Sequence, residues 1–283
     1  MGNIKINKPS LKDIKNIFSN INNAILSICD VLYFNKNDIK KKKPEEIYQL
    51  IIDNWDYELF KKSIRKIALT TKYSIDNLNK NIFIYNESIE KLYKEHGGDL
   101  SWGFAPNTYD SKLTLIVRSC KNFELGENEL KIKVTKDFLM KRYISSRSFL
   151  YEYFLVIENH NIIPSLGNNK NLDFYIDGPD YDLKNTSSPT KKFKEDFGEK
   201  WKEVANENVD LVIRYLYEYQ GEERFDNSNR LYFLDFSNNF KTVDEIKCLC
   251  KSFIKPKIYD IIYPYTNKLE TKSYKTQAMG VII

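Results

Sequence analysis

The chain has 283 residues, of which 42% are hydrophobic and 29% are charged, and it contains only 10 glycines and 8 prolines. This composition excludes collagen-like, low-complexity and largely disordered chains and predicts a folded protein with a substantial core. The 44 Lys and Arg residues against 39 Asp and Glu residues give a net charge of +5, which permits a polyanionic partner without demanding one.

The sequence contains no signal for membrane insertion or export. No run approaches the roughly 18 consecutive apolar residues of a membrane-spanning helix, and the opening MGNIKINKPS lacks the apolar segment of a signal peptide. The four cysteines include no C-x-x-C pair, and the chain has only two histidines. We therefore expect a cytoplasmic protein with no membrane partner, no structural zinc site and no Ser-His or Cys-His hydrolase chemistry.

The first third of the chain is predicted to be helical. Apolar residues recur at helical spacing from Ile14 to Ile28 and again from Leu59 to Ala68. Four lysines at 40–43 precede Pro44 and two glutamates, a pattern typical of a solvated loop that enters a helix; contact of these lysines with DNA is the alternative. Residues 1–110 are assigned to a mostly helical region for DNA recognition or dimerisation.

From residue 111 to residue 283 the order of elements predicts an α/β domain. Extended segments are expected at 112–120 and 130–135, and a helix at about 136–159. An apparent hairpin at 171–189 follows. A long helix is then predicted at 193–219, a strand at 230–236, a helix at 243–253 and a final apolar segment at 278–283.

The hairpin contains the clearest functional pattern. If its turn is a four-residue loop, Ile176 lies opposite Tyr181 and Asp173 lies opposite Lys184. Because side chains alternate along a strand, Asp173, Asp182 and Lys184 then share one face. Two carboxylates suit Mg²⁺, and a neighbouring lysine can orient the water that attacks a phosphodiester. The alternative is an ion-pair cluster on a polar sheet face.

The residues from Asp173 through YDLKNT to Pro189 resemble the active-site hairpin of the PD-(D/E)xK nucleases, especially type II restriction endonucleases with a D-L-K-x-T core. Downstream, RYLYEYQG at 214–221, RF at 224–225 and NRL at 229–231 look like elements that follow the lysine strand in one such group. The likeness spans about residues 152–235, with Leu172 where a proline is usual. It implies a restriction-endonuclease-like core with a central mixed sheet flanked by helices.

The resemblance further implies a Mg²⁺-dependent enzyme of a restriction-modification system that cleaves double-stranded DNA at a specific sequence. Asp173 and Asp182 would bind the metal and act in catalysis with Lys184, and Asp177 is an alternative first acid. We expect a homodimer, because two antiparallel strands at a symmetric site are most simply cut by a two-fold dimer. The alternatives are another PD-(D/E)xK nuclease, in repair or phage defence, and a non-catalytic nucleic-acid-binding protein.

Further candidate residues lie outside the hairpin. Such folds often add a glutamate from the preceding helix, and Glu152 lies on the apolar face of that helix, where an acid needs a partner or a metal. Glu158 is the alternative. Gln220, Arg224 and Arg230 are candidate DNA contacts, because Gln and Arg side chains bind phosphates and base edges.

Overall fold

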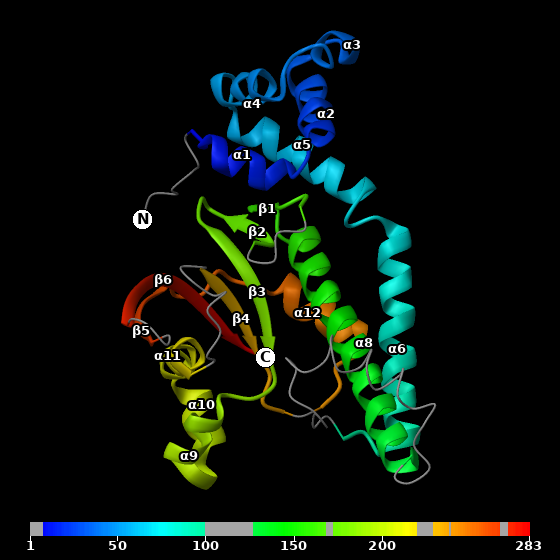
Figure 1. Ribbon diagram of the computed structural model, residues 1–283, viewed down its shortest axis with the longest axis vertical. Coiled ribbons are helices and arrows are strands. Elements are labelled where there is room, and N and C mark those ends of the chain that lie inside the picture. Colours follow the sequence, from blue (N-terminus) through cyan, green and yellow to red (C-terminus); the bar gives the residue numbers. More distant parts are fainter. Residues whose placement is uncertain (1–7, 100–126, 168–171, 220–228, 238, 267–270) are drawn as a thin grey trace.

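The computed structural model describes residues 8–99, 127–167, 172–219, 229–237, 239–266 and 271–283 (Figure 1). The N-terminal region is helical, with α1 (Leu11–Phe18), α2 (Ile21–Leu32), α3 (Lys36–Ile39), α4 (Pro44–Asp53), α5 (Tyr57–Thr70) and α6 (Ile75–His96). Polar side chains begin most of these helices: those of Ser10, Asn20, Asp56 and Ser74 each accept a backbone N–H of the first turn. Pro44 is the first residue of α4, as its sequence context predicts.

The strands of the described residues form one six-stranded mixed sheet in the order β1-β2-β3-β4-β6-β5. They are β1 (Ile162–Pro164), β2 (Phe174–Ile176), β3 (Asp180–Thr186), β4 (Arg230–Leu234), β5 (Tyr259–Thr266) and β6 (Thr271–Ile282). The central strands β3, β4 and β6 are parallel, whereas β1, β2 and β5 pair antiparallel with their neighbours. The predicted α/β class and mixed sheet are therefore confirmed.

Helices lie on both sides of the central strands (Figure 1). On one side, an apolar cluster joins β3 and β4 to α8 (Glu127–Glu158), α12 (Val243–Lys251) and α6. On the other side, a second cluster joins β4 and β6 to α9 (Lys191–Phe197), α10 (Trp201–Glu207) and α11 (Val209–Tyr219). Alternation along β4 separates the two clusters, since Leu231 and Phe233 belong to the first and Tyr232 and Leu234 to the second.

The N-terminal helices pack on the β1–β2 edge of the sheet. Their apolar cluster includes Ile163 and Tyr175, so this edge is covered. Arg65 of α5 strengthens the contact, because its Nη1 donates to the carbonyls of Asn159 and Ile162 at 3.0 and 2.9 Å, and its Nη2 donates to that of Ile157 at 3.3 Å. One guanidinium thus binds both the end of α8, where carbonyls lack helical partners, and β1.

One predicted strand is wrong. Residues 130–135 lie inside α8, which begins at Glu127. Six alternating residues are a weak strand signal, and α8 extends over a sequence that contains neither glycine nor proline. The extended segment predicted at 112–120 lies outside the described residues. The helices predicted at 136–159 and 243–253 and the strand at 230–236 are confirmed within a few residues, apart from the earlier start of α8.

The single helix predicted at 193–219 is also wrong, because it is three helices. Gly198 ends α9 with a φ of 52°, a conformation that glycine adopts at little cost, and the short 3₁₀ turn Gly198–Lys200 follows. Asn208 ends α10, and its Nδ2 donates to the Val204 carbonyl at 3.1 Å. Across the described residues, no helix is both long enough and apolar enough to cross a bilayer.

Candidate active site

The hairpin forms with a register two residues away from the predicted one. Phe174 pairs with Tyr181 and Tyr175 with Asp180, whereas the four-residue loop predicted Ile176 opposite Tyr181. The turn is centred on Asp177 and Gly178, which have φ values of 51° and 122°, and Ile176 N–H donates to the Pro179 carbonyl at 3.0 Å. Positive φ at both central residues is the tight hairpin turn that Asp-Gly favours.

This correction changes which side chains lie opposite one another. A shift of two residues leaves each side chain on its predicted face, because the alternation has a period of two. Asp173, however, lies beside Asp182 rather than opposite Lys184: its backbone N–H donates to the Tyr181 carbonyl at 2.9 Å, and its Oδ2 accepts from the Leu183 N–H at 2.8 Å. The hairpin therefore sets two carboxylates next to each other.

Both hairpin carboxyl groups have raised pKa values. Burial is the main cause for Asp173, and the charge of Asp182 adds to it; the Leu183 N–H and the charges of Lys72 and Lys184 act in the opposite direction. Burial also raises the pKa of Asp182, against the opposing effects of Lys184 and Arg230. Raised carboxyl pKa values show that the folded protein holds these negative charges at a cost, which a bound cation would reduce.

Two cations flank Asp182, whose side chain is 3% exposed. Nζ of Lys184 lies 2.8 Å from Oδ1 and 2.7 Å from Oδ2, and this lysine keeps 33% of its side chain exposed. Nε of Arg230 lies 3.9 Å from Oδ2. Arg230 is fully buried, donates to the Tyr232 hydroxyl at 2.9 Å and lies over the Tyr217 ring.

The burial of Arg230 corrects its predicted role. The sequence makes Arg230 a candidate DNA contact, but its side chain is fully buried beside Asp182 and does not reach a duplex. Its guanidinium acts instead as a counter-charge for the hairpin acid. The other two predicted DNA contacts, Gln220 and Arg224, lie outside the described residues.

Glu152 enters the site from α8, and two residues that sequence reasoning missed hold it in place. Nζ of Lys72 lies 2.6 Å from Glu152 Oε1, and the Tyr73 hydroxyl donates to the same oxygen. Burial and then the charge of Asp173 raise the pKa of Glu152. Lys72 and Tyr73 lie between α5 and α6, where no pattern in the sequence marks them.

The alternative acids do not join this group. Asp177 lies in the turn, and its Oδ2 is 2.9 Å from Nζ of Lys255. Glu158 is the last residue of α8, and its charge acts on the Cys250 thiol. Of the two alternative first acids, Asp173 is therefore the one that lies beside Asp182.

The two hairpin acids fit Mg²⁺ by their chemistry. This ion prefers oxygen ligands and is usually bound by one or two carboxylates, with waters and substrate phosphates as further ligands. Within the described ranges, no three Asp, Glu, His or Cys side chains are grouped so that they could hold one metal ion. Asp173 and Asp182 match the one or two carboxylates that usually bind this ion.

Comparisons of the chain with protein-family models, with curated proteins and with solved structures find no match. Three largely buried carboxylates stand among three cations, and one of these cations, Lys184, is one-third exposed. Concentrated buried charge with a solvent-accessible lysine is typical of sites that bind ions or act in catalysis.

Proposed function

We propose that the protein is a Mg²⁺-dependent endonuclease of the restriction type, with a restriction-endonuclease-like core that acts on double-stranded DNA. The observation that supports this most is the position of Lys184, 2.8 and 2.7 Å from the two oxygens of Asp182, on a strand that also sets Asp182 beside Asp173. An ordinary ion pair gains nothing from a second buried carboxylate, which adds repulsion and desolvation cost. Two adjacent carboxylates are instead expected where a metal cation binds between them and a substrate phosphate.

Each hairpin side chain would have a distinct task. Asp173 and Asp182 would hold the ion, which when bound would polarise the scissile phosphate and lower the pKa of a bound water. The exposed part of Lys184 allows its ammonium to hydrogen-bond the attacking water and to offset charge developing on the phosphate. Arg230, at 3.9 Å, favours the ionised form of Asp182.

Glu152 would orient groups at the edge of the same site. Lys72 and Tyr73 both bind its Oε1, so the carboxylate is held in one position, and its second oxygen can accept from water or a substrate group. These two residues precede α6, so the N-terminal region contributes directly to the site. Its function would not be limited to DNA recognition or dimerisation.

Nicking of supercoiled plasmid tests the proposal. Wild type is expected to cleave with Mg²⁺ and not with EDTA, and Lys184→Ala to bind duplex nearly as well while cleaving roughly 100-fold more slowly or worse, because Lys184 acts mainly in the transition state. Lys255→Ala is the matched control. Lys255 pairs with Asp177 in the same hairpin at 2.9 Å and is 30% exposed, but it lies outside the site. Equal cleavage by Lys184→Ala and wild type would contradict the assignment.

Metal binding and specificity are tested separately. Mg²⁺ or Ca²⁺ is expected to raise the melting temperature of wild type and not that of Asp182→Asn.

Digestion of phage DNA to discrete bands would support sequence-specific cleavage, whereas a smear would indicate another kind of nuclease. Binding without any cleavage would indicate a non-catalytic nucleic-acid-binding protein. Light scattering with a cognate duplex tests the proposed homodimer.

A further inference from the structure

Arg147, on α8, is a buried cation that the proposed nuclease chemistry does not use. Its side chain is 9% exposed, and within the described residues no carboxylate lies within ion-pair distance of its guanidinium. Among the described residues it makes one hydrogen bond, a long one from Nη1 to the Tyr143 hydroxyl at 3.4 Å, and its guanidinium lies over the Tyr143 ring at 5.1 Å. Its Nε is buried and has no hydrogen-bond partner in the part of the chain that the structure describes.

Other arginines of the chain show what this one lacks. Arg142, five residues earlier on α8, pairs with Glu87 at 2.6 Å, and Arg65 donates to three carbonyls. A buried charge without a partner costs several kcal/mol in general, so it is rarely kept unless something pairs with it. The free Nε edge of Arg147 therefore indicates an anion as the partner.

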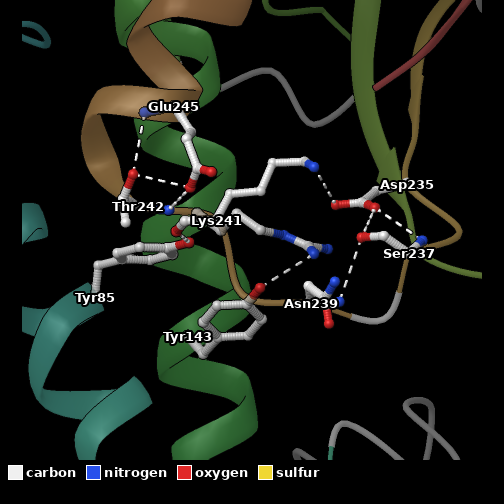
Figure 2. Close-up of polar contacts among 9 residues, drawn as sticks. Tyr85, Tyr143, Asp235, Ser237, Asn239, Lys241, Thr242 and Glu245 are labelled. Atoms are coloured by element: carbon white, nitrogen blue, oxygen red, sulfur yellow. Dashed lines mark hydrogen bonds and ion pairs between the residues drawn. The ribbon is translucent and has the colours of Figure 1, made fainter.

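A second cation, Lys241, and two exposed polar residues, Ser237 and Asn239, follow the end of β4 (Figure 2). Nζ of Lys241 lies 3.3 Å from Oδ2 of Asp235, and Oδ1 of Asp235 accepts from the Ser237 hydroxyl at 2.6 Å and from its N–H at 3.1 Å. Ser237 and Asn239 are exposed, and the Asn239 N–H donates to the Ser237 hydroxyl at 3.3 Å. Exposed polar side chains therefore lie beside the largely buried charges of Asp235 and Lys241.

Tyrosines connect Arg147 to this group. The Tyr143 hydroxyl accepts from Arg147, and the Tyr143 ring stacks on Tyr85 with ring centroids 5.4 Å apart. Tyr85 in turn donates to the Lys241 carbonyl at 2.5 Å. Burial raises the pKa of Tyr85, and the charge of Arg147 opposes this rise. Burial likewise raises the pKa of Tyr151, with Arg147 acting against the rise and Asp235 adding to it. Arg147, Lys241 and Asp235 thus share neighbours and together carry a net charge of about +1.

We propose that Arg147 and Lys241 form a phosphate-binding site at the carboxyl-terminal end of β4. A guanidinium presents its Nε edge as a fork that fits two oxygens of a phosphate, and the lysine adds a second, mobile charge. Ligands of open α/β sheets commonly bind outside the carboxyl ends of parallel strands, which is where Asp235 and Lys241 lie. The Asp235 carboxylate holds Lys241 in place. Its negative charge offsets one of the two positive charges, so the site favours an anion of low charge.

This site is separate from the hairpin site. Asn185 follows Lys184 in β3, so its side chain lies on the opposite face, and its Nδ2 is 3.5 Å from the hydroxyl of Ser148, the neighbour of Arg147 on α8. The bound phosphate group could come from inorganic phosphate, from a nucleotide or from a nucleic acid. The shared chemistry is the phosphate group, and separate measurements distinguish the sources.

Thermal unfolding of the full chain tests the site, with phosphate compared to chloride at equal pH and ionic strength. Wild type is expected to melt about 5 °C higher when phosphate exceeds its Kd a hundredfold. Arg147→Met should lose this shift, and its melting temperature in chloride should equal or exceed that of wild type, because a buried unpaired charge is removed. Repeating the titration with a deoxynucleoside 5′-monophosphate and with a short duplex shows which source binds more tightly.

Two control variants locate the effect. Arg142→Met removes a paired arginine from the same helix and should retain the full phosphate shift. Lys184→Ala should retain it too, which separates this site from the proposed nuclease site. If Arg147→Met does not fold, Lys241→Met decides, with an expected tenfold or greater loss of phosphate affinity. No phosphate-dependent shift in wild type, or an equal shift in Arg147→Met or Lys241→Met, overturns the proposal.

Discussion

Arg230 and Asp182 form a buried pair whose strength can be estimated from the structure. Nε of Arg230 lies 3.9 Å from Oδ2 of Asp182, and their side chains are 0% and 3% exposed. With an effective dielectric constant of about 20, two unit charges at that distance interact by roughly 4 kcal/mol. Removing one partner leaves the other charge buried, so Arg230→Met should lower the free energy of unfolding by about 3–5 kcal/mol.

A double-mutant cycle isolates this interaction, because Arg230 also contacts Tyr232 and Tyr217. Urea unfolding of wild type, Arg230→Met, Asp182→Asn and the double variant, without divalent ions, should give a coupling of about 3–4 kcal/mol. The destabilisation of the double variant should then be well below the sum of the two single effects. We expect this although Lys184 also pairs with Asp182, because Lys184 is partly solvated.

The control is a shorter but exposed pair. Nζ of Lys66 lies 2.5 Å from Oδ1 of Asp30, with side chains 71% and 35% exposed. Solvent screening should limit its coupling to about 1 kcal/mol or less. A coupling below about 1 kcal/mol for Arg230 and Asp182, or one no larger than that of Lys66 and Asp30, would refute the conclusion that burial sets the strength of this pair.

Three further predictions concern Glu152, Tyr73 and Gly280. The folded protein raises the pKa of Glu152, so protonation of this carboxyl stabilises the folded state at low pH. This stabilisation is lost as pH rises from about 4.3, the ordinary pKa of a glutamate, through the pKa of Glu152 in the folded protein. Urea unfolding of Glu152→Gln should therefore depend less on pH across that range than unfolding of wild type. Tyr73→Phe keeps the ring contacts but loses the hydroxyl that donates to Glu152, which should cost about 2 kcal/mol in urea unfolding; no loss would contradict this bond. Gly280→Ala places a Cβ 2.6 Å from Cγ1 of Val209 and should cost about 1–3 kcal/mol, with stability partly restored by Val209→Ala.

Much of the fold is predictable where the sequence pattern is local. Helical spacing correctly predicts helices in the N-terminal region, and Pro44 marks the start of α4. The apolar run 230–236 predicts β4, which is buried throughout because both faces of this central strand are covered. The apolar spacing at 193–219 does not reveal where the predicted helix breaks. Gly198 and Asn208 end α9 and α10, but glycine and asparagine also occur inside helices without ending them.

The hairpin site, too, is predictable from the local sequence only in part. Sequence alone determined that Asp173, Asp182 and Lys184 lie on one hairpin, since each is within a few residues of an Asp-Gly turn and alternation sets the faces. The register that sets Asp173 beside Asp182 depended on backbone torsions at the turn.

Only the tertiary structure decided what surrounds the hairpin. The Tyr73 hydroxyl reaches Glu152 from 79 residues away, and Arg230 lies beside Asp182 because β4 pairs in parallel with β3. A local pattern reports the neighbours that a residue meets within a few positions of the chain. Contacts between distant segments depend instead on how helices and strands pack, which also explains why Arg230 is buried although its residue type suggested an exposed contact with DNA.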